Sequence, residues 1–417
     1  MDSGPGLDII VGGLGNDLAS GGTNPDETFA GPGDDLIEAG GGTDTVLGDS
    51  GDDWIEGGAQ SDEIFGDSGA PLFDDLNAPG DEVIDGQGGD DTLAAEGGDD
   101  VMLTGPGTDQ YIGLRGFDWV THADDPLPAD ADLGRVLEPL PPPGGNLQDQ
   151  YGDVEALSGW SLDDVLKGDD AVPATDIEPG VPIGSNVLTA RGIGLVDGLR
   201  GLLPAGITSF GGGNILLGGA GSDRLEGRGG DDVIDGDRWL DVRLSVRTNP
   251  TDPATETQSF AGLAGLRDAV FAGTVDPGNV MAVREIIAPP NVANDVDTAA
   301  FSDVRSRYTV TTNGAVTTVT HHPAPSPGGE PPKSDGTDTL RGIERLMFAD
   351  SIVPVAPGDF VVTTTSGDRT ATISWAGPAV DAATRFEVHW DDPVSGQAKV
   401  RDVGAGGPAW KAQTWNW

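Results

Sequence analysis

The chain has 417 residues, of which 67 are glycine, 31 are proline and none is cysteine, so disulfides and thiolate metal sites are excluded. A formal net charge of −48 argues against nucleic acid and anionic membranes as partners, because a protein that follows phosphate groups needs an excess of Lys and Arg. Residues 1–121 hold 28 Asp and Glu against one basic residue, Arg115, and this self-repulsion opposes a compact state unless counter-charge is bound. Cations are the expected partners.

The first element is an array of nine-residue units that begins at Ser3 with SGPGLDIIV, GGLGNDLAS and GGTNPDETF and continues to Phe65. Its sixth position is aspartate in seven successive units, at Asp8, Asp17, Asp26, Asp35, Asp44, Asp53 and Asp62. The eighth position is mostly apolar, although Ala19 and Thr28 fill it poorly. Each unit therefore reads as a glycine-rich loop followed by a short strand with one inward side chain.

The same register resumes at Asn77 after an eleven-residue insertion, and again at Ser209. Its sixth positions are then Glu82, Asp91, Asp100, Asp109 and Asp118 in the second block, and Asn214, Asp223 and Asp232 in the third. A disordered acidic linker is the alternative that the charge permits, but disorder gives no reason to keep aspartate and an aliphatic residue in fixed phase.

This pattern resembles the G-G-x-G-x-D-x-U-x repeat of the RTX, or haemolysin-type, calcium-binding proteins. The resemblance implies a parallel β-roll with two units per turn and Ca²⁺ held between stacked loops. It also implies that Asp8, Asp26, Asp44 and Asp62 line one edge of the roll, with Asp17, Asp35 and Asp53 on the other. The expected metal ligands are the sixth-position acids of all three blocks, from Asp8 to Asp118 with Glu82 included, together with Asp223 and Asp232.

Electrostatics supports this interpretation. Strands in adjacent turns lie about 4.8 Å apart, so stacked carboxylates repel by about 3 kcal/mol per pair at an effective dielectric near 20. Calcium takes six to eight oxygen ligands, whereas magnesium demands a tighter octahedral geometry. Because such sites fill at millimolar rather than micromolar calcium, we expect a chain that is unfolded inside the cell and folded outside it.

The remaining chain shows mixed signals. Residues 122–208 are expected to be a proline-rich linker and mixed α/β connector, with one degenerate unit at Asp164 and a short helix near 186–203. After a second roll segment at 209–241, residues 242–352 are expected to form an α+β region. There we expect helices over 259–272 and 277–287 and a hairpin turning at Asn313-Gly314.

Two further resemblances concern the C-terminal part. Stretches such as DVEALSGWSLDDVLKGDD and LRDAVFAGTVDPGNVMAVREI resemble the region downstream of the catalytic domain in large secreted haem peroxidases of the animal type. This implies a peroxidase-associated tail, and no haem-binding residue is carried over. Residues 353–417 resemble part of a fibronectin type III domain, with Trp375 and Phe386 where that sandwich has core aromatics.

Catalytic motifs are absent. The sequence has no H-E-x-x-H, no G-x-S-x-G and no Gly-Lys of a phosphate-binding loop, and His321-His322 are expected to face solvent. Trp54 and Trp119 are expected to cover the outer face of the roll rather than to bind sugar. No signal peptide or apolar run long enough to span a membrane is evident.

We therefore predict a mainly β, non-enzymatic, calcium-binding protein that is secreted to the extracellular space by bacterial type I export. Its predicted architecture is a parallel β-roll in two segments, an α+β region and a partial β-sandwich. Its role is structural or adhesive, and the adhesive role implies a cell-surface or matrix target. The alternative is a non-catalytic tail of a haem peroxidase exoprotein.

Overall fold

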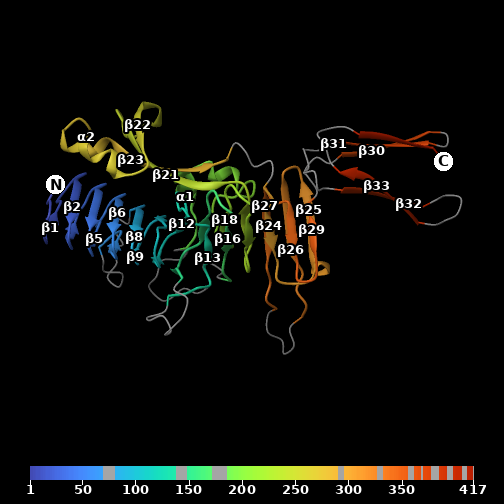
Figure 1. Ribbon diagram of the computed structural model, residues 1–417, viewed down its shortest axis with the longest axis horizontal. Helices are drawn as coiled ribbons and strands as arrows, with labels where there is room; N and C mark the ends of the chain where they lie inside the picture. The colour runs from blue at the N-terminus through green and yellow to red at the C-terminus, as the bar shows by residue number, and fades with distance from the viewer. Residues whose placement is uncertain are drawn as a thin grey trace.

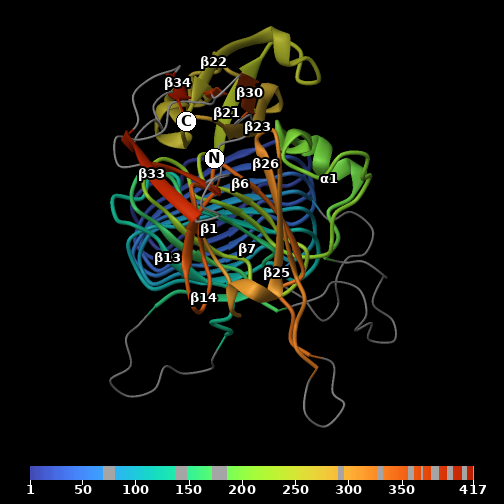
Figure 2. The same ribbon diagram turned by 90° about the vertical axis from the view of Figure 1, so that its right-hand side faces the viewer.

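The computed structural model describes residues 1–68, 80–137, 148–170, 186–289, 295–325 and 332–355, and beyond these only the backbone of five strands. Short strands dominate the fold, and most of them are stacked along one long axis (Figure 1). Viewed along that axis, the chain winds as a flattened coil with a further layer above it (Figure 2).

One wall of the coil is a 12-stranded sheet that is parallel over its first ten strands. Its order is β2 (Leu18–Thr23), β4 (Leu36–Gly41), β6 (Trp54–Ala59), β8 (Val83–Gly88), β10 (Val101–Leu103), β12 (Trp119–Thr121), β15 (Ala156–Ser158), β18 (Ile215–Leu217), β20 (Val233–Asp235), β27 (Thr337–Arg341), β26 (Val316–His321) and β25 (Tyr308–Asn313).

The opposite wall consists of two sheets, one after the other. The first is β1 (Ile9–Val11), β3 (Glu27–Phe29), β5 (Thr45–Leu47), β7 (Glu63–Phe65), β9 (Thr92–Ala94), β11 (Gln110–Ile112) and β14 (Gln150–Gly152). The second is β13 (Asp130–Asp132), β16 (Val165–Lys167), β19 (Arg224–Glu226), β24 (Thr298–Ala300), β28 (Arg345–Met347) and β29 (Ile352–Pro354).

The register of the parallel pairs shows two units per turn. Val46 lies opposite Ile64, and Ile37 lies opposite Ile55, an offset of 18 residues in both walls. The eighth-position side chains form the interior, where Ile37, Val46 and Ile55 are fully buried. The weak positions Ala19 and Thr28 are buried in the same place. The parallel β-roll predicted from the repeats is therefore confirmed.

The roll does not stop at residue 121. Strands β15 and β16 lie in the region expected to be a linker and connector, and β15 pairs with β12 and β18 and so joins the two predicted segments into one continuous stack. Strands β24, β27 and β28 extend the stack through the expected α+β region. These turns keep a buried interior residue, such as Leu157, Leu166 or Leu340, although they have lost most of the repeat glycines. The proline-rich stretch 138–147 lies outside the described residues.

A covering layer, residues 186–210 and 238–289, packs on the outer face of the 12-stranded wall (Figure 1). It contains α1 (Ala190–Leu195), β17 (Val196–Asp197), η1 (Leu199–Gly201), β21 (Trp239–Arg247), η2 (Pro253–Thr255), β22 (Glu256–Phe260), η3 (Leu263–Gly265), α2 (Arg267–Phe271), η4 (Pro277–Asn279) and β23 (Val280–Ile287). Trp54 and Trp119 are buried beneath this layer, as expected for residues that cover the roll.

The covering layer reaches back to the first turns of the roll. The buried Glu56 carboxylate accepts hydrogen bonds from the Leu263 backbone N–H (2.6 Å) and from Trp54 Nε1 (2.9 Å). Arg267 pairs with Glu38 at 2.8 Å. These contacts join residues more than 200 positions apart, so the layer connects the C-terminal half of the chain to the N-terminal turns.

The expected helices are only partly present. Helix α2 is shorter than predicted, and residues 280–287 form strand β23 rather than a helix. The reason is tertiary, because β23 pairs antiparallel with the nine-residue strand β21 along its whole length and packs Val280 into the apolar cluster under the layer. The helix expected near 186–203 is present as α1 and η1.

The hairpin at Asn313-Gly314 is confirmed by the antiparallel pair β25–β26, which follows η5 (Arg305–Arg307). The expectation that both histidines face solvent is wrong for His321. That side chain is buried and stacks on Tyr308 with ring centroids 4.4 Å apart, because β26 is an inner strand rather than an edge.

The C-terminal strands form two small antiparallel sheets. They are β30 (Val361–Gly367), β31 (Thr370–Ala376) and β34 (Lys411–Asn416) in one, and β32 (Arg385–Asp391) and β33 (Ala398–Ala405) in the other. Trp375 and Phe386 fall within β31 and β32. The partial fibronectin-like sandwich stays a prediction.

Candidate metal centres

The sixth-position acids lie in two columns, one along each edge where the chain crosses between the walls. Within a column, most carboxylates accept the backbone N–H of the acid one turn earlier, whereas Glu82 accepts no hydrogen bond. The Asp26 N–H bonds Asp44 Oδ1 at 2.8 Å, and the Asp35 N–H bonds Asp53 Oδ1 at 2.7 Å. The same bond recurs where insertions lengthen a turn, as from Asp62 to Asp91 at 2.8 Å. The columns place the predicted ligands in register over the whole N-terminal array.

The other carboxylate oxygen of most column members is buried and has no hydrogen-bond partner. Among the described residues this holds for Oδ2 of Asp8, Asp26, Asp35, Asp44, Asp53, Asp62, Asp100, Asp118, Asp223, Asp232 and Asp297, and for both carboxylate oxygens of Glu82. An unpartnered buried carboxylate oxygen is strongly unfavourable, since protein hydrogen bonds normally satisfy buried polar groups. A repeated unsatisfied acceptor in register therefore points to a ligand that is not part of the chain.

Glycines at the first position of several units bring main-chain oxygens to the same place, whereas Ala30, Ala39 and Ala95 fill that position in others. A Cβ at Gly57 would lie 2.8 Å from Asp62 Oδ2 and 3.0 Å from the Gly86 carbonyl oxygen. A Cβ at Gly48 would overlap both Asp53 Oδ2 and the Gly66 carbonyl oxygen. At these two positions only glycine leaves the space open, so the unsatisfied oxygens of Asp62 and Asp53 each stand beside a carbonyl oxygen of the next turn.

Burial makes these carboxyl groups hard to ionise without a counter-charge. It raises the pKa of Asp35 to about 6, of Asp62 to about 7 and of Asp53 to about 9. In the third block it raises the pKa of Asp223 to about 7 and of Asp232 to about 8. A bound cation would reverse this effect, because it favours the charged form.

Side chains alone do not build a metal site. Over the residues that the structure describes, no three carboxylate or imidazole groups gather closely enough to hold an ion. A cation between two turns would therefore take one or two carboxylate oxygens and complete its shell with carbonyl oxygens and water. An all-oxygen shell of this kind suits calcium, a hard cation with a flexible geometry.

The columns include acids that the repeat pattern alone did not mark as ligands. The Asp223 N–H bonds Asp297 Oδ1 at 2.8 Å, the Asp232 N–H bonds Asp338 Oδ1 at 3.0 Å, and the Asp297 N–H bonds Glu344 Oε2 at 2.9 Å. Asp297, Asp338 and Glu344 each stand two residues before a buried interior side chain. That spacing survives in the sequence, but the glycines that would have made it recognisable do not.

The fold and the columns together define a parallel β-roll protein with repeated carboxylate and carbonyl sites between its turns. A family model, the RTX calcium-binding nonapeptide repeat (4 copies), matches residues 2–37, 20–55, 38–71, 78–120 and 208–238. The chain is therefore an RTX repeat protein over these residues. No curated protein matches it. The resemblance to peroxidase-associated regions stays a prediction.

None of the described helices has the length and apolar character needed to cross a bilayer.

Proposed function

We propose that this chain is a non-catalytic structural protein whose folding depends on calcium bound between the turns of the roll. The observation that carries the proposal is the ladder of buried, unsatisfied carboxylate oxygens, several of which stand beside a repeat glycine and a neighbouring carbonyl oxygen. Cations placed between the turns would neutralise the stacked acids and give those oxygens a partner.

Calcium affinity links this role to the extracellular space. Extracellular calcium modules have dissociation constants of about 10⁻⁴ to 10⁻³ M, so a site at ten times its Kd adds about 1.4 kcal/mol of stability. Several sites in series would add an amount comparable to the stability of a whole domain. At cytosolic calcium the same sites would add almost nothing. We therefore place the folded protein outside the cell, where a rigid calcium-filled roll suits a structural or adhesive role.

The test is a calcium titration of the full chain followed by far-ultraviolet circular dichroism. Addition of calcium to chelator-treated protein should increase the β signal in a steep transition, and magnesium at equal concentration should not replace it. The double variant Asp44→Ala and Asp53→Ala should shift the transition to higher calcium. A chain that is equally ordered in chelator and in ~10 mM calcium would contradict the proposal, since this concentration lies well above the expected Kd range.

A further inference from the structure

Three members of the columns, Glu155, Asp164 and Asn214, lie in the middle of the roll at the starts of β15, β16 and β18. None of them has a buried side-chain oxygen or nitrogen without a partner, which is true of only some column members in the repeat blocks, such as Asp91 and Asp109. We call these three repeat units the seam. The N-terminal block, residues 1–121, precedes it, and the C-terminal block, which begins with Asp223 and Asp232, follows it.

Protein groups satisfy the seam on both edges of the roll. Glu155 Oε2 accepts the Asp118 N–H (2.9 Å), and its Oε1 accepts Asn186 Nδ2 (2.7 Å). On the opposite edge, both oxygens of Asp164 accept backbone N–H groups, from Ala129 at 2.8 Å and from Trp160 at 3.0 Å. Each oxygen of these two carboxylates therefore already has a protein donor, unlike Oδ2 of Asp53 or Asp62.

Asn214 replaces the acid of its turn with a neutral amide. Its Oδ1 accepts the Asp169 N–H at 2.9 Å, and its Nδ2 donates to the Glu155 carbonyl oxygen at 3.2 Å. The Asn214 Nδ2 group thus donates a hydrogen bond to a main-chain oxygen, which an ionised carboxylate at this position could not do because it has no donor. A carbonyl oxygen that receives an N–H bond is less available to a cation.

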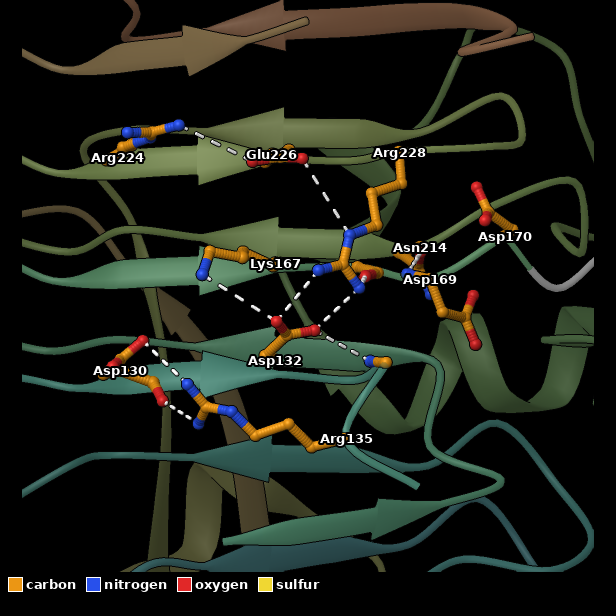
Figure 3. A network of polar contacts seen from close by, with 12 residues as sticks. Asp130, Asp132, Arg135, Lys167, Asp169, Asp170, Asn214, Arg224, Glu226 and Arg228 are labelled. Carbon is orange, nitrogen blue, oxygen red and sulfur yellow. Dashed lines mark hydrogen bonds and ion pairs between the residues drawn. The ribbon is translucent and has the colours of Figure 1, made fainter. Parts of the chain in front are cut away.

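A positive charge of the chain itself lies beside this turn (Figure 3). Arg228 extends from the loop after β19 and donates to the Gly168 carbonyl oxygen at 2.9 Å. Its Nη1 and Nη2 also contact the two carboxylate oxygens of Asp132, at 2.7 Å and 2.8 Å. One guanidinium therefore joins a loop carbonyl after β16 to the carboxylate of Asp132 in β13, across three successive turns of the roll.

Position 228 itself supports this reading. It is the second residue of its unit, GRGGDDVID, and its backbone lies in the left-handed region with φ 68°. Glycine fills the same position in the preceding unit, at Gly219 with φ 102°. Arginine adopts this conformation less readily than glycine does. Its side-chain contacts supply the compensation.

The charge state of Asp132 contrasts with that of the column acids. Burial would raise the pKa of Asp132, but the hydrogen bonds and charge of Arg228 outweigh burial and lower it. Asp132 therefore keeps its negative charge with a partner that the chain provides, whereas no ion pair to Asp35, Asp53 or Asp62 is formed by the described residues.

The seam is also packed on both faces by apolar side chains. Leu157, Leu166 and Leu216 fill the interior, while Ile215 and Leu217 pack outward against the covering layer. The layer is hydrogen-bonded to the seam and to the strand before it, since the Leu240 N–H donates to Ser158 Oγ at 2.9 Å and Thr121 Oγ1 donates to the Leu240 carbonyl oxygen at 3.0 Å.

We propose that the seam is a metal-independent joint, so that the roll holds two separate calcium-responsive blocks on either side of turns that Arg228, Asn214 and backbone donors keep in place. The inference rests on the proposed function, because it assumes that calcium fills the two blocks. Without calcium, the seam stays ordered and the N-terminal block opens.

Hydrogen exchange of the full chain, read by mass spectrometry in calcium and in chelator, tests this directly. Peptides from β2, β4 and β6 should exchange at least about tenfold faster in chelator than in calcium. Tenfold is the change in the opening equilibrium that follows when the stabilisation by one calcium site, filled at ten times its Kd, is lost. Peptides from β15, β16 and β18 should exchange at the same rate in both conditions. If no peptide responds to calcium, the proposed function fails. If the seam responds as strongly as the blocks, only the joint is refuted.

Two variants sharpen the test. Arg228→Gln should speed exchange at the seam in chelator, whereas Arg224→Gln, which alters an arginine on the same β19 turn that contacts only Glu226 at 3.7 Å, should not. The double variant Asn214→Asp and Arg228→Gly restores aspartate and glycine to their repeat positions. It should make the seam responsive to calcium and raise bound calcium per chain above that of the unaltered protein. A seam that stays unresponsive in this variant would contradict the assignment of Asn214 and Arg228.

Discussion

Replacing Asp53 by asparagine should raise stability without calcium and reduce the stabilisation that calcium adds. The Asp53 Oδ1 accepts the Asp35 N–H at 2.7 Å, and an asparagine Oδ1 keeps this bond. The unpartnered Oδ2 becomes an NH₂ group, which removes the charge and one ligand for a cation. The substitution thus separates the role of the carboxylate in metal binding from its role in the hydrogen-bonded column.

The magnitude follows from the pKa of Asp53, which burial raises from 3.8 to about 9. Without metal at pH 7, this carboxyl must take up a proton when the chain folds, at a cost of about 4 kcal/mol. Asparagine avoids that cost, but its unpartnered NH₂ costs about 1–3 kcal/mol. We expect Asp53→Asn to raise the free energy of unfolding in chelator by about 1–3 kcal/mol. In calcium, the stabilisation that the metal adds should fall by about 1.4 kcal/mol or more.

The assay is urea unfolding followed by circular dichroism, in chelator and in saturating calcium, with equal slopes required for comparison. Glu63→Gln is the matched control, because it removes one negative charge from an exposed position of the same array. It should change both free energies by less than about 0.5 kcal/mol. A loss of stability of similar size in both conditions for Asp53→Asn would refute the reasoning, since the buried charge would then carry no cost in the metal-free roll.

Three further outcomes are expected. In chelator, the urea midpoint of unfolding should fall as pH rises from about 5 to 8. The pKa values of Asp53, Asp62 and Asp223 are raised in the folded chain, so it binds more protons than the unfolded chain in this pH range. Urea unfolding at several pH values measures this, and a midpoint that rises with pH would contradict it. Gly48→Ala should weaken calcium binding in a titration, since its methyl group would overlap Asp53 Oδ2 and the Gly66 carbonyl oxygen, whereas Gly194→Ala, with open space around it, should leave affinity unchanged. Glu56→Ala should lower the free energy of unfolding by about 2–3 kcal/mol, because it leaves the Leu263 N–H and Trp54 Nε1 buried without their acceptor. A change below about 0.5 kcal/mol would show that this contact does not stabilise the covering layer on the roll.

The sequence by itself determined the roll over residues 1–121 and its ligand columns. Each nine-residue unit encodes its own loop and strand, and the phase of aspartate and aliphatic residue repeats without reference to distant residues. The acids from Asp8 to Asp118, together with Asp223 and Asp232, accordingly lie in the predicted columns. The hairpin at Asn313-Gly314 is local in the same sense.

Only the tertiary structure decided the rest. The turns of β24 and β27 have lost most of their repeat glycines, and they are recognisable as part of the roll because they stack on a neighbouring turn. Residues 280–287 are a strand because β21 offers a partner, although their isolated pattern also suits a helix. Arg228 meets Asp132 across 96 residues, and Leu263 meets Glu56 across 207. A repeat specifies contacts one turn away, whereas these contacts depend on where long insertions return, which no local pattern encodes.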